Sequence, residues 1–150
     1  RGADDLDDAD IVLIGISRTG KTPLSMYLAH LGYRVANIPL VPGVEPPASL
    51  FSVDPEKVFG LISTTEVVST IRYRRFGDDM SRAVASDYAD PERVRSEMDE
   101  ARALIKKLGC ITVRTDGKAI EESAAEILER MRQVRIGRER RRERLDAQSI

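Results

Sequence analysis

The chain has 150 residues, with 24 basic and 25 acidic side chains, one cysteine and one histidine. This length suits one domain with a tail, and the balanced charge argues against a generally basic nucleic-acid binder. A single cysteine excludes an internal disulfide framework and a multi-cysteine zinc site. No apolar run reaches the ~18 residues of a membrane span. Because the chain has a single cysteine, we expect a reducing, cytoplasm-like compartment. No segment resembles a signal peptide.

Strands and helices are expected to alternate along the chain. Short apolar runs predict four strands, at residues 11–14, 33–41, 57–62 and 110–113. Apolar residues at steps of three and four predict four helices, at residues 23–31, 63–75, 91–108 and 118–133. This alternation predicts an α/β fold with a mainly parallel sheet flanked by helices.

The remaining segments carry weaker signals. Residues 77–90 have no clear period and are expected to form a mobile loop. Residues 1–134 are assigned to the folded domain. Residues 135–150 are mostly arginine and glutamate and are predicted to form a charged C-terminal tail, either frayed helix or disordered. Since the first residue is Arg1 rather than methionine, we expect the chain to be a piece of a longer protein.

The segment after the first strand carries the chemistry. Residues 15–22, GISRTGKT, fit the P-loop pattern G-x-x-x-x-G-K-[ST] at every fixed position. The glycines let the backbone wrap around a diphosphate, and the loop N–H groups and the following helix N-terminus attract anions. Lys21 would charge-pair with the terminal phosphate, and the Thr22 hydroxyl would ligate Mg²⁺. The residues predicted to bind the nucleotide are Gly15, Ile16, Ser17, Arg18, Thr19, Gly20, Lys21 and Thr22.

The loop predicts a P-loop kinase-like domain but leaves its reaction open. No strand candidate ends cleanly in the aspartate that motors and switches use. Arg18 is predicted to offset transition-state charge beside Lys21. Arg72 and Arg75 have two interpretations: they complement a helix C-terminus, or they clamp a substrate phosphate.

A general base would accept the proton of an attacking hydroxyl. Asp10, Asp54 and Asp116 are the candidates. Asp116 is favoured, because it follows the fourth strand at the edge where the phosphate loop lies. The predicted catalytic residues are therefore Lys21, Arg18 and Asp116.

The sequence resembles the pyruvate, phosphate dikinase regulatory protein family, which includes regulators of phosphoenolpyruvate synthase. The resemblance rests on residues 15–41 (GISRTGKTPLSMYLAHLGYRVANIPLV), 43–47 (GVEPP), 57–61 (KVFGL) and 118–122 (KAIEE). It covers the chain to about Arg132, and the forms GKTPLS and ANIP favour the dikinase branch over the synthase branch. Family members are usually about twice this length, and this chain is similar to their C-terminal half.

The resemblance implies a bifunctional enzyme. It would phosphorylate a threonine of pyruvate, phosphate dikinase with ADP as donor. It would also remove that phosphate with inorganic phosphate, releasing pyrophosphate. ADP, inorganic phosphate and Mg²⁺ are the implied ligands, and the cytoplasm, or the plastid stroma if the source is a plant, is the implied location. No nucleic-acid or membrane partner is expected, and a homodimer stays open. The alternatives are a small-molecule kinase with a lid at residues 77–90, and a nucleotide-binding module that is inactive without its other half.

Overall fold

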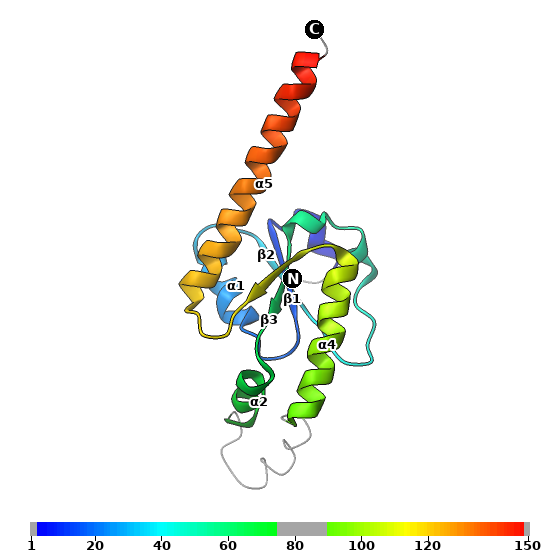
Figure 1. Cartoon of the computed structure of the whole chain (residues 1–150), viewed down its shortest axis with the longest axis vertical. Coiled ribbons are helices and arrows are strands. Elements are labelled where there is room, and N and C mark those ends of the chain that lie inside the picture. Colours follow the sequence, from blue (N-terminus) through cyan, green and yellow to red (C-terminus); the bar gives the residue numbers. More distant parts are fainter. Residues whose placement is uncertain (1–2, 75–89, 149–150) are drawn as a thin grey trace.

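A computed structural model of the chain describes residues 3–74 and 90–148. Its centre is a four-stranded sheet of β1 (Ile11–Gly15), β2 (Val35–Pro39), β3 (Val58–Ile62) and β4 (Ile111–Arg114) (Figure 1). The strand order is β2-β1-β3-β4, and every neighbouring pair is parallel. The predicted α/β fold with a parallel sheet is therefore confirmed.

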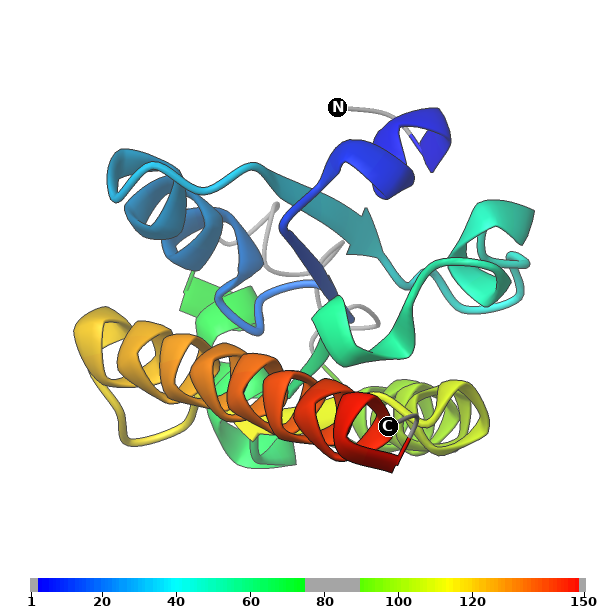
Figure 2. The ribbon, with the colours of Figure 1, turned by 90° about the horizontal axis from the view of Figure 1, so that it is seen from above.

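Helices cover both faces of the sheet. They are α1 (Lys21–His30), α2 (Thr65–Arg74), α4 (Pro91–Leu108) and α5 (Ile120–Gln148), with short 3₁₀ segments at Ala3–Asp8, Ala48–Phe51 and Pro55–Lys57. In Figures 1 and 2, α1 and α5 lie on one side of the sheet and α4 on the other. None of the described helices is both long and apolar enough to cross a membrane.

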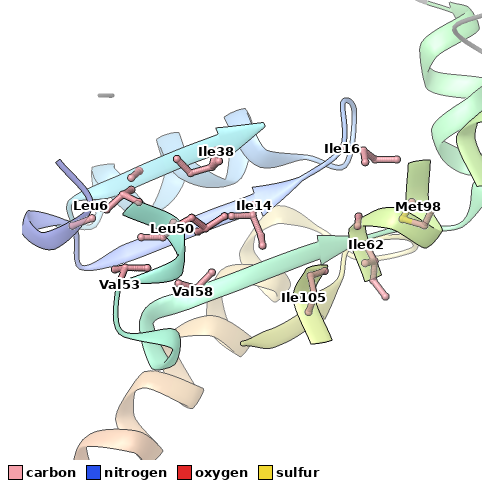
Figure 3. Close-up of a cluster of buried hydrophobic side chains, with 14 of the residues drawn as sticks. Leu6, Ile14, Ile16, Ile38, Leu50, Val53, Val58, Ile62, Met98 and Ile105 are labelled. Carbon is pink, nitrogen blue, oxygen red and sulfur yellow. The ribbon is translucent and has the colours of Figure 1, made fainter. Parts of the chain in front are cut away.

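Two hydrophobic clusters fill the spaces between the sheet and its helices. One lies between the sheet and α4, where Ile14, Ile62 and Ile105 pack together (Figure 3). The other joins the opposite face of the sheet to α1 and α5 through residues such as Leu28, Phe59 and Ile127. The central strands β1 and β3 are buried along their whole length, which explains why their sequences are continuous apolar runs.

Local signals explain the ends of α4. The Asp90 carboxylate accepts a hydrogen bond from the Glu92 N–H, Pro91 occupies the first turn, and Gly109 follows in the left-handed conformation. These are the N-cap, first-turn proline and C-terminal glycine that the sequence pattern contains. The helix bounds agree with the predicted residues 91–108. The edge strand β2 ends at Pro39, as the missing proline N–H requires.

Three of the four described helices differ from their predicted ranges. Helix α2 spans Thr65–Arg74 and is slightly shorter than the predicted 63–75. Helix α1 begins at Lys21 rather than Pro23, because a proline is tolerated anywhere in a first turn, where its N–H has no partner. Helix α5 runs to Gln148 instead of ending at 133, so residues 135–148 are helical and continuous with it. Arginine and glutamate are good helix formers. In addition, Arg138 pairs with Asp54 at 2.7 Å and Glu56 at 2.5 Å, which ties this part of α5 to the domain. Of the loop predicted at residues 77–90, residues 77–89 lie outside the described residues, and Asp90 is the N-cap of α4.

Candidate active site

The phosphate-binding loop predicted from sequence joins β1 to α1 at the carboxyl edge of the sheet. Glycine is favoured at two positions of this loop, Gly15 and Gly20, for different structural reasons. A Cβ on Gly15 would lie 2.8 Å from the Thr19 hydroxyl oxygen and 3.0 Å from the Leu61 carbonyl oxygen, so the close packing there excludes a side chain. Gly20 has φ of 91°, a left-handed conformation that glycine adopts without strain.

Arg18 also adopts a left-handed backbone conformation, although it is not a glycine. It is the only non-glycine residue of the described chain with a positive φ, at 69°, and its side chain is exposed. Backbone strain of this kind persists where the surrounding structure fixes it, and it concentrates at binding sites. The loop therefore holds Arg18 outward at some energetic cost.

Hydrogen bonds fix the backbone of the loop from within. The Ile16 carbonyl accepts from the Thr19 hydroxyl at 2.9 Å and from the Lys21 ammonium at 2.7 Å. Thr115 is the residue that follows β4. Its hydroxyl donates a hydrogen bond of 2.9 Å to the Thr19 carbonyl oxygen. Thr19 is almost completely buried, so its contact with Ile16 is shielded from water. The loop is thus tied both to itself and to the end of a neighbouring strand.

A buried ion pair between α2 and α4 contacts the backbone of the loop. Arg72 of α2 is fully buried and meets the Glu97 carboxylate of α4 through two hydrogen bonds, of 2.8 and 3.0 Å. The same guanidinium donates to the Ser17 carbonyl at 3.2 Å. Arg72 was predicted either to complement a helix end or to clamp a substrate phosphate. In the structure, the Arg72 side chain is buried and contacts the backbone of the loop at Ser17, so it does not face solvent.

The electrostatics of the loop favour an anion. Burial, with the nearby positive charges of Arg18 and Arg72, lowers the pKa of the Lys21 ammonium from 10.5 to about 8. The protein thus holds a cationic side chain where its charged form is disfavoured. A phosphate group beside Lys21 would reverse this effect, because an opposite charge stabilises the protonated amine.

The first turn of α1 adds to the positive electrostatic potential at the loop. Gly20 at its N-cap position provides no side-chain hydrogen bond to the first N–H groups, and no acidic side chain lies in the first turn. Unsatisfied N–H groups at a helix N-terminus attract anions. Thr22, the predicted magnesium ligand, is exposed in this turn.

The three candidate bases are separated by the fold. Asp10 accepts a hydrogen bond from the Arg34 N–H, and Asp54 caps a 3₁₀ turn before β3, both at the amino edge of the sheet. Asp116 lies at the carboxyl edge, where it lines a hollow of about 180 Å³ together with Arg18 and Gly20. It pairs there with Arg114 at 3.0 Å. Its position agrees with the sequence analysis, and its role as a base stays a prediction. Arg75 lies outside the described residues.

Comparison with known proteins decides the family. A model of the kinase/pyrophosphorylase family matches residues 1–128. The chain belongs to this family. Its relatives include pyruvate, phosphate dikinase regulatory proteins, by name, of Desulfitobacterium hafniense (50% identical over 121 residues) and Carboxydothermus hydrogenoformans (46% over 121 residues). The matches cover 81% of this chain and 44% and 43% of those proteins. The chain therefore spans less than half the length of these family members.

Two residues of the candidate site, Glu97 and Thr115, were not predicted from the sequence. Glu97 carried a usable signal, because it lies on the otherwise apolar stripe of α4 that includes Val94, Met98 and Ala101. A carboxylate on a buried helix face implies a buried cation nearby. Thr115 carried no such signal, since a threonine after a strand is common and its partner Thr19 is 96 positions away in the sequence.

Proposed function

We propose that this chain is the nucleotide-binding half of a regulator that moves phosphate onto and off a threonine of pyruvate, phosphate dikinase. In this proposal ADP donates the phosphate, and inorganic phosphate removes it. The target is proposed from the names of the relatives and from the resemblance described above. The observation that carries the nucleotide part of the proposal is the loop with its depressed lysine pKa.

Both reactions are proposed to use one phosphate site. In the forward reaction, the threonine oxygen bonds to the β-phosphorus of ADP and the bond from that phosphorus to the bridging oxygen breaks. AMP leaves, and the threonine proton is released. In the reverse reaction, an oxygen of inorganic phosphate attacks the phosphothreonine phosphorus, and the threonine oxygen leaves and regains a proton as pyrophosphate forms. Each is an in-line transfer through a centre of concentrated negative charge.

The loop residues fit the anionic ligand of both reactions. Lys21 and Arg18 supply positive charge to the terminal phosphate, and Gly15 to Thr22 supply the surrounding backbone. Arg72 acts on the phosphates through Ser17, whose carbonyl it holds. Thr22, exposed in the first turn of α1, would hold Mg²⁺. The ion would neutralise part of the phosphate charge.

The experiment compares the wild type with Lys21→Ala. The chain is mixed with ADP and pyruvate, phosphate dikinase, and phosphothreonine is measured; the reverse reaction starts from phosphorylated dikinase and inorganic phosphate. We expect Lys21→Ala to lose both reactions. Lys106→Ala, which removes an exposed lysine in the last turn of α4, is the matched control. Loss of only one reaction would contradict a shared phosphate site, and transfer from ATP to a small metabolite would favour a small-molecule kinase.

A nucleotide-binding module without transfer activity is the second candidate. It is favoured by one observation: the chain covers only about 44% of the length of its relatives. Calorimetry with ADP distinguishes the two, because this candidate predicts wild-type ADP binding and no phosphothreonine. The absence of ADP binding would contradict both.

A further inference from the structure

A large apolar groove opens beside the phosphate-binding loop. It has a volume of about 490 Å³ and lies between α4 and the segment that follows β2. We call it the proline groove, after Pro39, Pro42, Pro46 and Pro47, which line one wall. Ala101 and Leu104 of α4 line the other. Its volume falls within the range of ligand-binding pockets.

The groove reaches the loop from one side. Ile16, the first residue after Gly15, is one of its lining residues. Glu97 also lines it, and Glu97 holds Arg72, which in turn contacts the Ser17 carbonyl. The smaller hollow of about 180 Å³ touches the loop through later residues, Arg18, Thr19 and Gly20. The two spaces therefore meet different parts of the same loop.

The charges of the two spaces differ in sign. Among the described residues, three carboxylates line the proline groove, those of Glu45, Glu97 and Glu100, and no basic side chain does. The Glu97 carboxylate is neutralised by Arg72, which leaves two negative charges. The described residues that line the smaller hollow include two basic side chains, Arg18 and Lys118, and one acidic side chain, Asp116. An anionic nucleotide is repelled from the groove and attracted to the hollow.

In-line transfer requires the donor and the acceptor on opposite sides of the moving phosphorus. We infer that the proline groove receives the threonine-bearing segment of the protein that is phosphorylated, while the nucleoside occupies the smaller hollow. This inference rests on the proposed function. It adds a binding site for the protein substrate. Because the walls of the groove are largely apolar, this site would take an uncharged segment with apolar side chains near its threonine.

The walls of the groove suit a protein segment. The four prolines fix backbone angles and leave few N–H donors, so this wall is stiff and recognises apolar side chains. A preformed wall binds a flexible segment at a lower ordering cost than a mobile one. Val41 and Val44 expose 50% and 62% of their surface here, which leaves apolar area available for a partner to cover.

This arrangement also changes the path of the threonine proton. Asp116 lines the donor hollow, whereas Glu45 and Glu100 line the groove where the hydroxyl arrives. The inference therefore assigns the proton to one of these two glutamates rather than to Asp116. Both are exposed, so a proton can pass from them to water.

The test places a charge in the groove without disturbing the fold. Val44→Asp alters an exposed wall residue, and Met26→Asp alters a similarly exposed residue of α1 that does not line the groove. For each variant, phosphothreonine formation is measured against dikinase concentration, and ADP affinity is measured by calorimetry. We expect Val44→Asp to raise the KM for dikinase roughly tenfold, because the variant loses one buried apolar contact with the target. Its Kd for ADP stays within about twofold of the wild type, and Met26→Asp changes neither quantity.

Two results would overturn the inference. A Val44→Asp variant with a wild-type KM for dikinase would show that the groove does not bind the target. A loss of ADP affinity in this variant would show that the groove holds the nucleotide. Failure of the wild type to bind ADP would instead contradict the proposed function, independently of the groove.

A crosslinking experiment tests the groove without any turnover. A photoreactive benzoylphenylalanine replaces Val44 in one sample and Met26 in another, and dikinase is added before illumination. We expect the groove probe to crosslink to the dikinase segment that contains the phosphorylated threonine, and the α1 probe not to do so. A crosslink to another part of dikinase, to a second copy of this chain, or to nothing would overturn the inference.

Discussion

Replacing Glu97 by glutamine tests the buried ion pair beneath the phosphate-binding loop. The change keeps the shape of the side chain and leaves the fully buried Arg72 guanidinium without a counter-charge. Removing one partner of a buried pair costs about 3–5 kcal/mol. Because the new amide still accepts one hydrogen bond, we expect a loss of about 3 kcal/mol in the free energy of unfolding.

Urea unfolding followed by circular dichroism measures this loss. For an m value of about 2 kcal/mol/M, the urea midpoint falls by roughly 1.5 M. Glu129→Gln is the matched control. It breaks a pair of similar geometry, at 2.6 Å to Arg132, in which both side chains are about half exposed. We expect no resolvable shift of the midpoint for the control, because water screens exposed pairs.

The loop should respond to the same substitution. Since Arg72 holds the Ser17 carbonyl, a displaced guanidinium leaves the loop backbone less fixed, and we expect weaker ADP binding by calorimetry at temperatures where the variant is folded. Arg72→Lys keeps the charge and loses the two-pronged contact with Glu97, so it should weaken ADP binding as well. A Glu97→Gln variant with an unchanged urea midpoint and unchanged ADP affinity would refute the reasoning.

Three further predictions concern the loop and its neighbours. The folded-state pKa of Lys21 lies below its unfolded value, so stability without nucleotide should rise between pH 8 and 10.5. At pH 8, Lys21 is about half protonated before ADP binds, so binding should take up about half a proton. Calorimetry in two buffers of different ionisation enthalpy detects this uptake, and no uptake would contradict the depressed pKa. Gly15→Ala places a Cβ 2.8 Å from the Thr19 hydroxyl and should weaken ADP binding roughly tenfold, whereas unchanged affinity would show that the loop adapts. Thr115→Val removes the hydrogen bonds to Thr19 and Ile62. It should cost about 1 kcal/mol in urea unfolding, and Thr112→Val, on the exposed side of β4, serves as its control.

The sequence alone was sufficient for features that depend on neighbouring residues. The apolar runs of β1 and β3, the capped ends of α4 and the glycines of the phosphate-binding loop all act over a few positions. Periodicity and capping report such local preferences directly. The parallel sheet followed from the alternation of strands and helices, and the candidate site could be predicted because the whole P-loop pattern lies in residues 15–22.

Only the tertiary structure revealed what supports that loop. Arg72 and Glu97 are 25 positions apart, and Thr115 is 96 positions from Thr19, so no local pattern reports either contact. The extent of α5 was missed for a similar reason, since Arg138 is anchored by Asp54, which lies 84 positions earlier. Buried charges are stabilised by partners that packing brings together, and packing depends on the whole chain. The sequence therefore predicted where a phosphate would bind, whereas the fold decided which residues hold that loop in place and which groove lies beside it.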